Sequence, residues 1–125
     1  MQIRIYYEDT DTGGIVYHSN YLNFCERARS EVFFSRGLNP VLENGHFVVK
    51  KLEANFIASA KLGDIIEVKN ELISLKGASF TLRQTIYKEN IKLFVLDVIL
   101  VFVSFDGKIQ RVDKQTTQLL QELFG

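Results

Sequence analysis

The sequence has one cysteine, one proline and no tryptophan among its 125 residues. Because Cys25 has no second cysteine to pair with, no disulfide can form within the chain. The first residues also lack the charged and apolar regions of an export signal, so we expect a cytoplasmic protein. Basic and acidic residues number 15 each, which leaves no basic excess and argues against nucleic acid as a partner.

Long hydrophobic runs are missing as well. The longest lies in residues 93–103, where Asp97 interrupts it, and it is far too short to span a bilayer. No repeat and no linker-like stretch divides the chain, so a single domain over residues 1–125 is predicted. Ten Phe and five Tyr are typical of a thick core, a buried interface or an apolar ligand slot.

Apolar periodicity predicts an α+β fold. A helical stripe contains Tyr21, Phe24, Cys25, Ala28 and Val32, and we expect Ser19 or Asn20 to cap this helix. Strands are predicted at residues 3–5, 47–58, 65–75, 80–86 and 91–104, and Asp113 is expected to cap a final helix. A single antiparallel sheet around one helix leaves an edge exposed, and such units usually dimerise.

The candidate site is the loop before the first helix, where Glu8, Asp9 and Asp11 precede a Gly-Gly pair and a histidine. Carboxylates so close together repel one another, and glycines leave the backbone unsupported. Such a segment adds no stability to a small domain, which favours a functional role.

Asp11 is the first choice for a catalytic carboxylate in acyl transfer. It could take a proton from water, or it could attack a carbonyl and form an anhydride. A solvated turn aspartate is the alternative for an isolated Asp beside glycine. Asp9 is expected to be a structural loop cap instead.

The rest of the loop offers further candidates. Gly14 lets a ligand approach the main chain, and the backbone N–H of His18, at the helix start, can polarise a carbonyl oxygen. Tyr7 could orient a ligand or a carboxylate, although packing explains it equally well. The spacing of Asp9, Asp11 and His18 matches no strong metal motif, so no metal is expected. Cys25 and His46 are expected to be structural.

These residues resemble a known family. The pattern Tyr-Tyr-x-Asp-Thr-Asp-x-x-Gly-x-Val-Tyr-His-x-x-Tyr, followed by Glu-Arg-Ala-Arg, is similar to hotdog-fold acyl-CoA thioesterases of the 4-hydroxybenzoyl-CoA thioesterase type. The similarity is greatest to the bacterial branch associated with the Tol-Pal envelope system. It covers residues 3–31 densely, and the later strand pattern fits to near the C-terminus.

The resemblance implies a five-stranded antiparallel sheet wrapped around the long helix, and a homodimer or homotetramer with sites at subunit interfaces. It implies that Asp11 is catalytic and that the His18 N–H binds the thioester carbonyl, with Tyr7 and the His18 ring belonging to the branch pattern. Gly14 and His18 would contact substrate. One departure is Ser59, where relatives commonly have proline, which puts any carry-over of coenzyme contacts in doubt.

The sequence therefore predicts a thioester hydrolase that cleaves acyl-CoA without a cofactor. Two alternatives stay open. One is a hydratase or dehydratase on the same fold, and the other is a non-catalytic module that binds acyl carrier protein. Carrier-protein thioesters are also a possible substrate class for the hydrolase itself.

Overall fold

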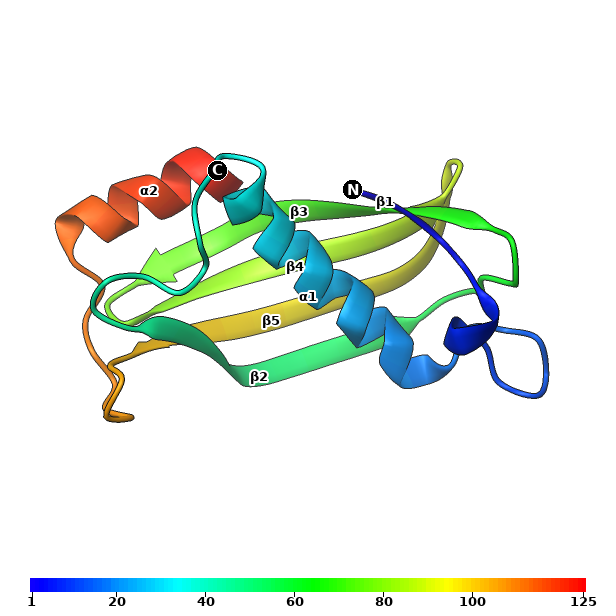
Figure 1. Ribbon diagram of the computed structural model, residues 1–125, viewed down its shortest axis with the longest axis horizontal. Coiled ribbons are helices and arrows are strands. Elements are labelled where there is room, and N and C mark those ends of the chain that lie inside the picture. Colours follow the sequence, from blue (N-terminus) through cyan, green and yellow to red (C-terminus); the bar gives the residue numbers. More distant parts are fainter.

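A computed structural model describes residues 1–125, and its elements follow the predicted order. Figure 1 shows the long helix lying across one face of a single sheet. The elements are β1 (Gln2–Arg4), the 3₁₀ turn η1 (Tyr7–Asp9), α1 (His18–Phe34), β2 (His46–Phe56), β3 (Ile65–Lys76), β4 (Ser79–Lys88), β5 (Ile91–Val103) and α2 (Lys114–Phe124).

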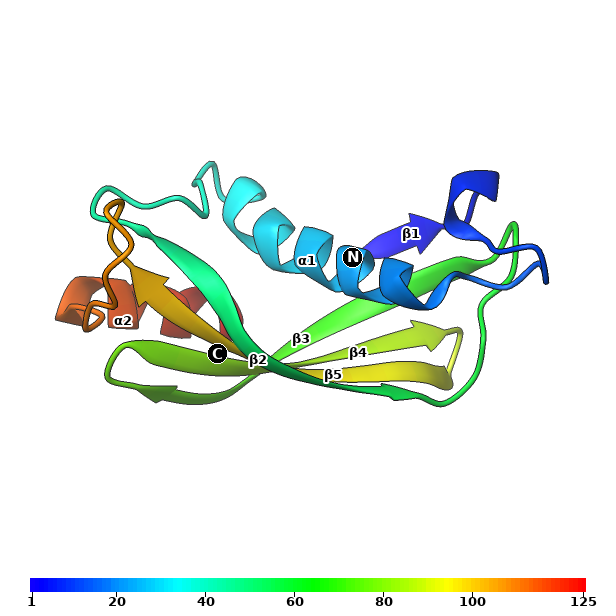
Figure 2. The same ribbon diagram turned by 90° about the horizontal axis from the view of Figure 1, so that it is seen from below.

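The strands form one five-stranded sheet in the order β1-β3-β4-β5-β2, with every neighbouring pair antiparallel. Figure 2 shows the twisted sheet curling beneath α1. This arrangement confirms the predicted α+β class and the five-stranded sheet around a long helix. The nearly continuous apolar run became β5, which lies between β4 and β2 and is buried along most of its length.

The core forms where the apolar stripe of α1 meets the inner face of the sheet. Phe24, Cys25 and Ala28 are buried there, as the helical periodicity predicts. One buried glutamine also joins the two layers. Gln84 on β4 donates to the Cys25 carbonyl at 2.8 Å and to Asn70 Oδ1 at 2.7 Å, and accepts from Arg29 Nη1 at 2.9 Å. The middle of α1 is thus tied to the sheet by hydrogen bonds as well as by apolar contacts.

The start of α1 differs from the prediction. The helix begins at His18 and Tyr17 is its N-cap, without a side-chain capping bond, so Ser19 and Asn20 lie inside the first turn. The Asn20 side-chain amide donates instead to Asp9 Oδ1 at 3.2 Å. The Asp113 prediction is confirmed, since its carboxylate accepts from the Thr116 N–H at 2.7 Å.

The two edges of the sheet differ in length. β1 has 3 residues, whereas β2 has 11 and pairs only with β5. Most of β2 is exposed, including the apolar side chains of Val48, Val49, Leu52 and Phe56. Neither helix is long and apolar enough to cross a membrane. β2 is therefore a long edge strand whose outer side pairs with no other strand of the chain.

Candidate active site

Asp9 holds the loop that precedes α1. Its side chain is only 5% exposed, and its two carboxylate oxygens accept from the Tyr6 N–H at 2.8 Å and from the Asn20 amide at 3.2 Å. Its carbonyl also accepts from the Tyr17 N–H at 2.9 Å. Asp9 therefore joins η1 to the first turn of α1, which is the structural role expected for it.

Asp11 has a different environment within the same loop. It is exposed, and its Oδ1 accepts from the Gly13 N–H at 2.8 Å, while its Oδ2 has no partner in the chain. The loop closes through bonds from the Asp11 N–H to the Ile15 carbonyl and from the Gly14 N–H to the Asp11 carbonyl. Gly14 has a φ of 82°, a left-handed conformation that most residues resist. This turn presents one free carboxylate oxygen to its surroundings.

The start of α1 supplies hydrogen-bond donors. The backbone N–H groups of His18 and Ser19 have no acceptor in the chain, as is usual in the first turn of a helix. The exposed His18 ring packs against the Tyr17 ring, with 4.4 Å between centroids. Free donors and the partial positive charge of the helix N-terminus together favour binding of an oxygen that gains negative charge.

Asp11 and His18 border a common cavity of about 280 Å³, here called the loop cavity. Its walls are mostly apolar, from the side chains of Tyr17, Tyr21, Phe56 and Ile57. A carboxylate and a helix N-terminus at the rim of an apolar slot form an arrangement able to hold a carbonyl compound and attack it.

The wall formed by residues 56–59 is fixed to the rest of the site through Ala60. Its N–H donates to the Tyr21 hydroxyl at 3.1 Å, and its carbonyl accepts from the Val16 N–H at 2.9 Å. The Tyr21 ring also stacks on Phe94, with 5.1 Å between centroids. The wall, the loop and α1 are therefore connected in one rigid unit.

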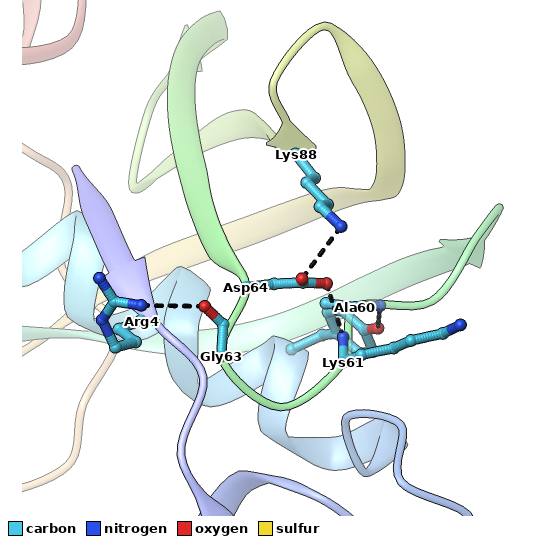
Figure 3. A network of polar contacts seen from close by, with 7 residues as sticks. Arg4, Ala60, Lys61, Gly63, Asp64 and Lys88 are labelled. Carbon is cyan, nitrogen blue, oxygen red and sulfur yellow. Dashed lines mark hydrogen bonds and ion pairs between the residues drawn. The ribbon is translucent and has the colours of Figure 1, made fainter.

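Asp64 stabilises the turn that follows this wall, as Figure 3 shows. Its carboxylate accepts from the Lys61 N–H at 2.8 Å and forms an ion pair of 2.9 Å with Lys88, while Arg4 donates to the Gly63 carbonyl. Burial by itself would raise the pKa of Asp64, but the Lys61 N–H and the Lys88 cation outweigh it and lower the pKa below its usual value. The carboxylate serves the turn and is not available for chemistry.

The predicted site residues are only partly brought together. Asp11 and His18 share the loop cavity, whereas Tyr7 is 83% exposed and, like Gly14, does not line it. Sequence reasoning missed Tyr21 and Phe56 as cavity walls. Tyr21 lies on the helical stripe and Phe56 on a strand, so both have the signature of core residues, and only the meeting of the two elements exposes them to the slot.

The structure also bears on Cys25 and on metal binding. Cys25 is fully buried, and burial raises the pKa of its thiol to about 12, so the thiol stays protonated and unreactive as expected for a core residue. No group of three or more His, Cys, Asp or Glu side chains is arranged to hold a metal ion.

Comparison with known proteins identifies the family. Residues 13–95 match the model of the thioesterase superfamily. The chain belongs to the thioesterase superfamily. A relative from Helicobacter pylori named acyl-CoA thioesterase YbgC is 46% identical over 87 residues. A relative from Escherichia coli named acyl-CoA thioester hydrolase YbgC is 40% identical over 107 residues. These matches cover 70% and 81% of this chain.

The matches span 65% of the Helicobacter protein and 78% of the Escherichia protein. Among solved thioesterase structures, a probable thioesterase from Bartonella henselae is 32% identical, with a TM-score of 0.85 over 90% of this chain and 97% of that one. These findings confirm the resemblance to hotdog-fold thioesterases and the fold class inferred from the sequence.

Proposed function

We propose that this member of the thioesterase superfamily hydrolyses acyl-CoA thioesters to a free acid and CoA. The observation that carries the proposal is the free Asp11 carboxylate oxygen, which borders the same cavity as the unpaired N–H groups at the start of α1. The names of the YbgC relatives support the substrate class.

The chemistry follows from the two kinds of group. The thioester carbonyl oxygen accepts hydrogen bonds from the His18 and Ser19 N–H groups, which stabilise the negative charge that develops there. Asp11 either takes a proton from the attacking water or attacks the carbonyl carbon itself, giving an anhydride that water then opens. In both routes the carbon–sulfur bond breaks and the CoA thiolate leaves. These steps need no cofactor.

The remaining site assignments rest on the resemblance. Gly14 keeps the loop open to the substrate and the His18 ring lies at the rim of the loop cavity. The resemblance also implies that Tyr7 orients substrate, a role that Tyr7→Phe tests. A cytoplasmic location and an association with the Tol-Pal system are part of the same proposal, and carrier-protein thioesters are a second class of substrate to test.

We also propose that the protein acts as a homodimer joined along β2, which can pair further into a tetramer. The free edge of β2 carries Lys51 and Glu53 on the outer face of the sheet, opposite Ile99 and Asp97 of β5. Antiparallel pairing of two β2 edges about Leu52 places Lys51 beside Glu53 of the partner subunit, twice by symmetry. Opposite charges thus favour a second copy over other occupants of the edge.

A charge exchange tests this dimer. Lys51→Glu places like charges opposite one another and should weaken the dimer, while Lys51→Glu combined with Glu53→Lys should restore it. Sedimentation at several concentrations measures the association. A wild-type protein that stays monomeric at high concentration would contradict the proposal.

The catalytic proposal is tested by thiol release from short, long and aromatic acyl-CoAs, with wild type and Asp11→Asn compared. Turnover that disappears in the variant supports it, and an Asp11→Asn protein that is folded and fully active contradicts it. A trans-2-enoyl-CoA belongs in the panel, because its consumption without thiol release would favour the hydratase. Copurification with carrier protein and no turnover on any thioester would favour the binding module.

A further inference from the structure

A second cavity, here called the aromatic cavity, lies at the opposite end of β2 from the loop cavity. It has a volume of about 300 Å³ and lies between α1, the start of β2 and the end of α2. Its walls include Phe33, Phe47, Phe80 and Phe124, together with the charged side chains of Glu26 and Arg29.

Arg29 is the unusual member of this cavity. Its Nη1 donates to Gln84 Oε1 at 2.9 Å, yet no carboxylate forms an ion pair with it. Burial lowers the pKa of Arg29, although Cys25 and Glu26 oppose this shift. Glu26 instead accepts from the Ser30 hydroxyl at 2.8 Å. The guanidinium therefore has N–H groups to spare in an apolar setting, where an oxygen acceptor would be bound strongly.

Within one subunit this cavity cannot serve Asp11. The two cavities share no lining residue, and Arg29 follows His18 by roughly 16 Å along α1 at a rise of about 1.5 Å per residue. Figure 1 shows α1 starting beside the end of β2 and running diagonally away from that edge toward its last turn. The aromatic cavity thus lies next to the first half of β2.

Antiparallel pairing of two β2 edges changes this relation. It brings the start of one strand, with Phe47, beside the end of the other, with Phe56 of the partner subunit. The aromatic cavity of each subunit then adjoins the loop cavity of its neighbour. An acyl group whose carbonyl lies at His18 of one subunit would extend into the aromatic cavity of the other.

We infer that Arg29 of one subunit selects the acyl group cleaved at Asp11 of the other, and that it favours acyl chains with an oxygen acceptor at the end far from the thioester. This inference rests on the proposed hydrolase and its β2 dimer. The phenyl rings hold the hydrocarbon part of the chain, and the guanidinium binds a terminal carboxylate or hydroxyl.

Matched acyl-CoAs test the specificity. The five-carbon series is pentanoyl-, 5-hydroxypentanoyl- and glutaryl-CoA, and an equivalent eight-carbon series allows for a deeper pocket. We expect wild type to favour an oxygen-terminated member over the plain acyl chain by about tenfold or more in kcat/KM. Arg29→Met should abolish this preference while still cleaving the plain chain. The hydroxyl and carboxylate members show which acceptor the guanidinium binds.

Two further variants serve as controls for the loss of the Arg29 side chain. Arg29→Lys keeps a cation that can bond to Gln84 and should retain part of the preference. Arg27→Met removes an exposed arginine of the same helix that lies over the Phe24 ring and outside the aromatic cavity, so it should leave the preference unchanged. Thermal unfolding identifies any variant whose loss is due to instability.

Mixed dimers test whether Arg29 acts across the interface. A dimer of one Asp11→Asn subunit and one Arg29→Met subunit, isolated by two affinity tags, contains one intact site only if Asp11 and Arg29 come from different subunits. We expect such dimers to recover the wild-type preference at about half the wild-type turnover. If both residues served the same subunit, the mixed dimer would keep the Arg29→Met specificity.

The outcomes separate the two proposals. Thioester cleavage with no preference for terminal oxygen, or a preference that Arg29→Met leaves intact, overturns the role of Arg29 and leaves the hydrolase standing. A preference lost in Arg29→Met but not recovered in mixed dimers overturns the cross-subunit site. Absence of hydrolysis on every substrate overturns both proposals.

Discussion

Asp9 and Asp11 lie two residues apart in one loop, yet the fold uses them in opposite ways. The Asp9 carboxylate is buried and both its oxygens accept hydrogen bonds from the loop and from α1. Asp11 is exposed, bonds with one oxygen to its own turn and keeps the other free beside the loop cavity. A carboxylate engaged by the fold stabilises structure, whereas one left partly free beside a cavity is available for chemistry.

The same contrast extends across the molecule. Gln84 and Asp64 have their polar atoms engaged by the helix and by the turn after the cavity wall. The N–H groups of His18 and Ser19, and part of the Arg29 guanidinium, lack partners in the chain. His18 borders the loop cavity and Arg29 borders a second one, so unused hydrogen-bonding capacity at a cavity marks these residues as candidates for function.

The largest expected effect is that of Asp11→Asn on turnover. The variant keeps the oxygen that accepts from Gly13 but loses the base or nucleophile, so kcat should fall by at least ~10²–10³, the loss typical of removing one catalytic donor. Because Asp11 is exposed, the midpoint of urea unfolding should hardly change. Thiol release and urea titration on the same preparation measure both quantities. An unstable Asp11→Asn variant with normal turnover would show that Asp11 is structural and not catalytic.

Asp9→Ala should have the complementary effect. The Tyr6 N–H and the Asn20 amide lose their acceptor in a nearly dry environment, which should lower the free energy of unfolding by about 1–3 kcal/mol. Urea unfolding measures the loss. Turnover should fall less than in Asp11→Asn, since the free carboxylate remains. Full stability with turnover abolished would show that Asp9 acts in the chemistry.

Gln84→Leu removes the polar connection between α1 and the sheet. Asn70, Arg29 and the Cys25 carbonyl each lose a partner, and we expect a loss of about 1–3 kcal/mol in the free energy of unfolding. The Asn70→Leu variant is a control at the rim of the same network. If Gln84→Leu proved as stable as wild type, apolar packing alone would be holding the helix in place.

Asp64 gives a smaller effect that depends on pH. Its pKa is lowered in the folded state, so its stabilisation is present above the unfolded value of about 3.9 and is lost as pH falls through the folded value. The free energy of unfolding of wild type should exceed that of Asp64→Asn by up to about 1 kcal/mol near pH 7, because Lys88 is partly exposed, and this difference should shrink as the pH falls through the folded pKa. Urea unfolding from pH 7 to pH 2.5 tests this sign; a difference that grew in acid would contradict it.

The smallest effect is expected for Tyr7→Phe. Here the family pattern implies a role with substrate, whereas the position of the side chain in the structure does not. The side chain is 83% exposed and its hydroxyl has no partner in the chain, so the folded monomer predicts a change in kcat/KM of no more than about twofold. Steady-state kinetics with one good acyl-CoA measures it, with Tyr6→Phe as the neighbouring control. A tenfold fall confined to Tyr7 would favour the substrate-orienting role that the family pattern implies.

Much of the architecture could be predicted because it follows from local patterns. Apolar periodicity indicated α1 and the order of the strands, and the almost continuous apolar run of residues 91–104 indicated the strand that is β5. The boundaries were less predictable. Ser19 and Asn20 are good capping residues by type, but the helix begins before them and the Asn20 amide donates to Asp9. These two residues are 11 apart in the sequence, so no rule based on neighbouring residues predicts their contact.

The sequence by itself determined which groups are candidates for chemistry, namely Asp11 in a glycine-rich turn and the donors at the start of a helix. Only the tertiary structure decided which of these groups are free. Folding buried Asp9 and Cys25, left Tyr7 outside the loop cavity, made Tyr21 and Phe56 cavity walls and left Arg29 without an ion pair. The reason is that reactivity depends on burial and on hydrogen-bond partners, and both are set by contacts between residues distant in the chain.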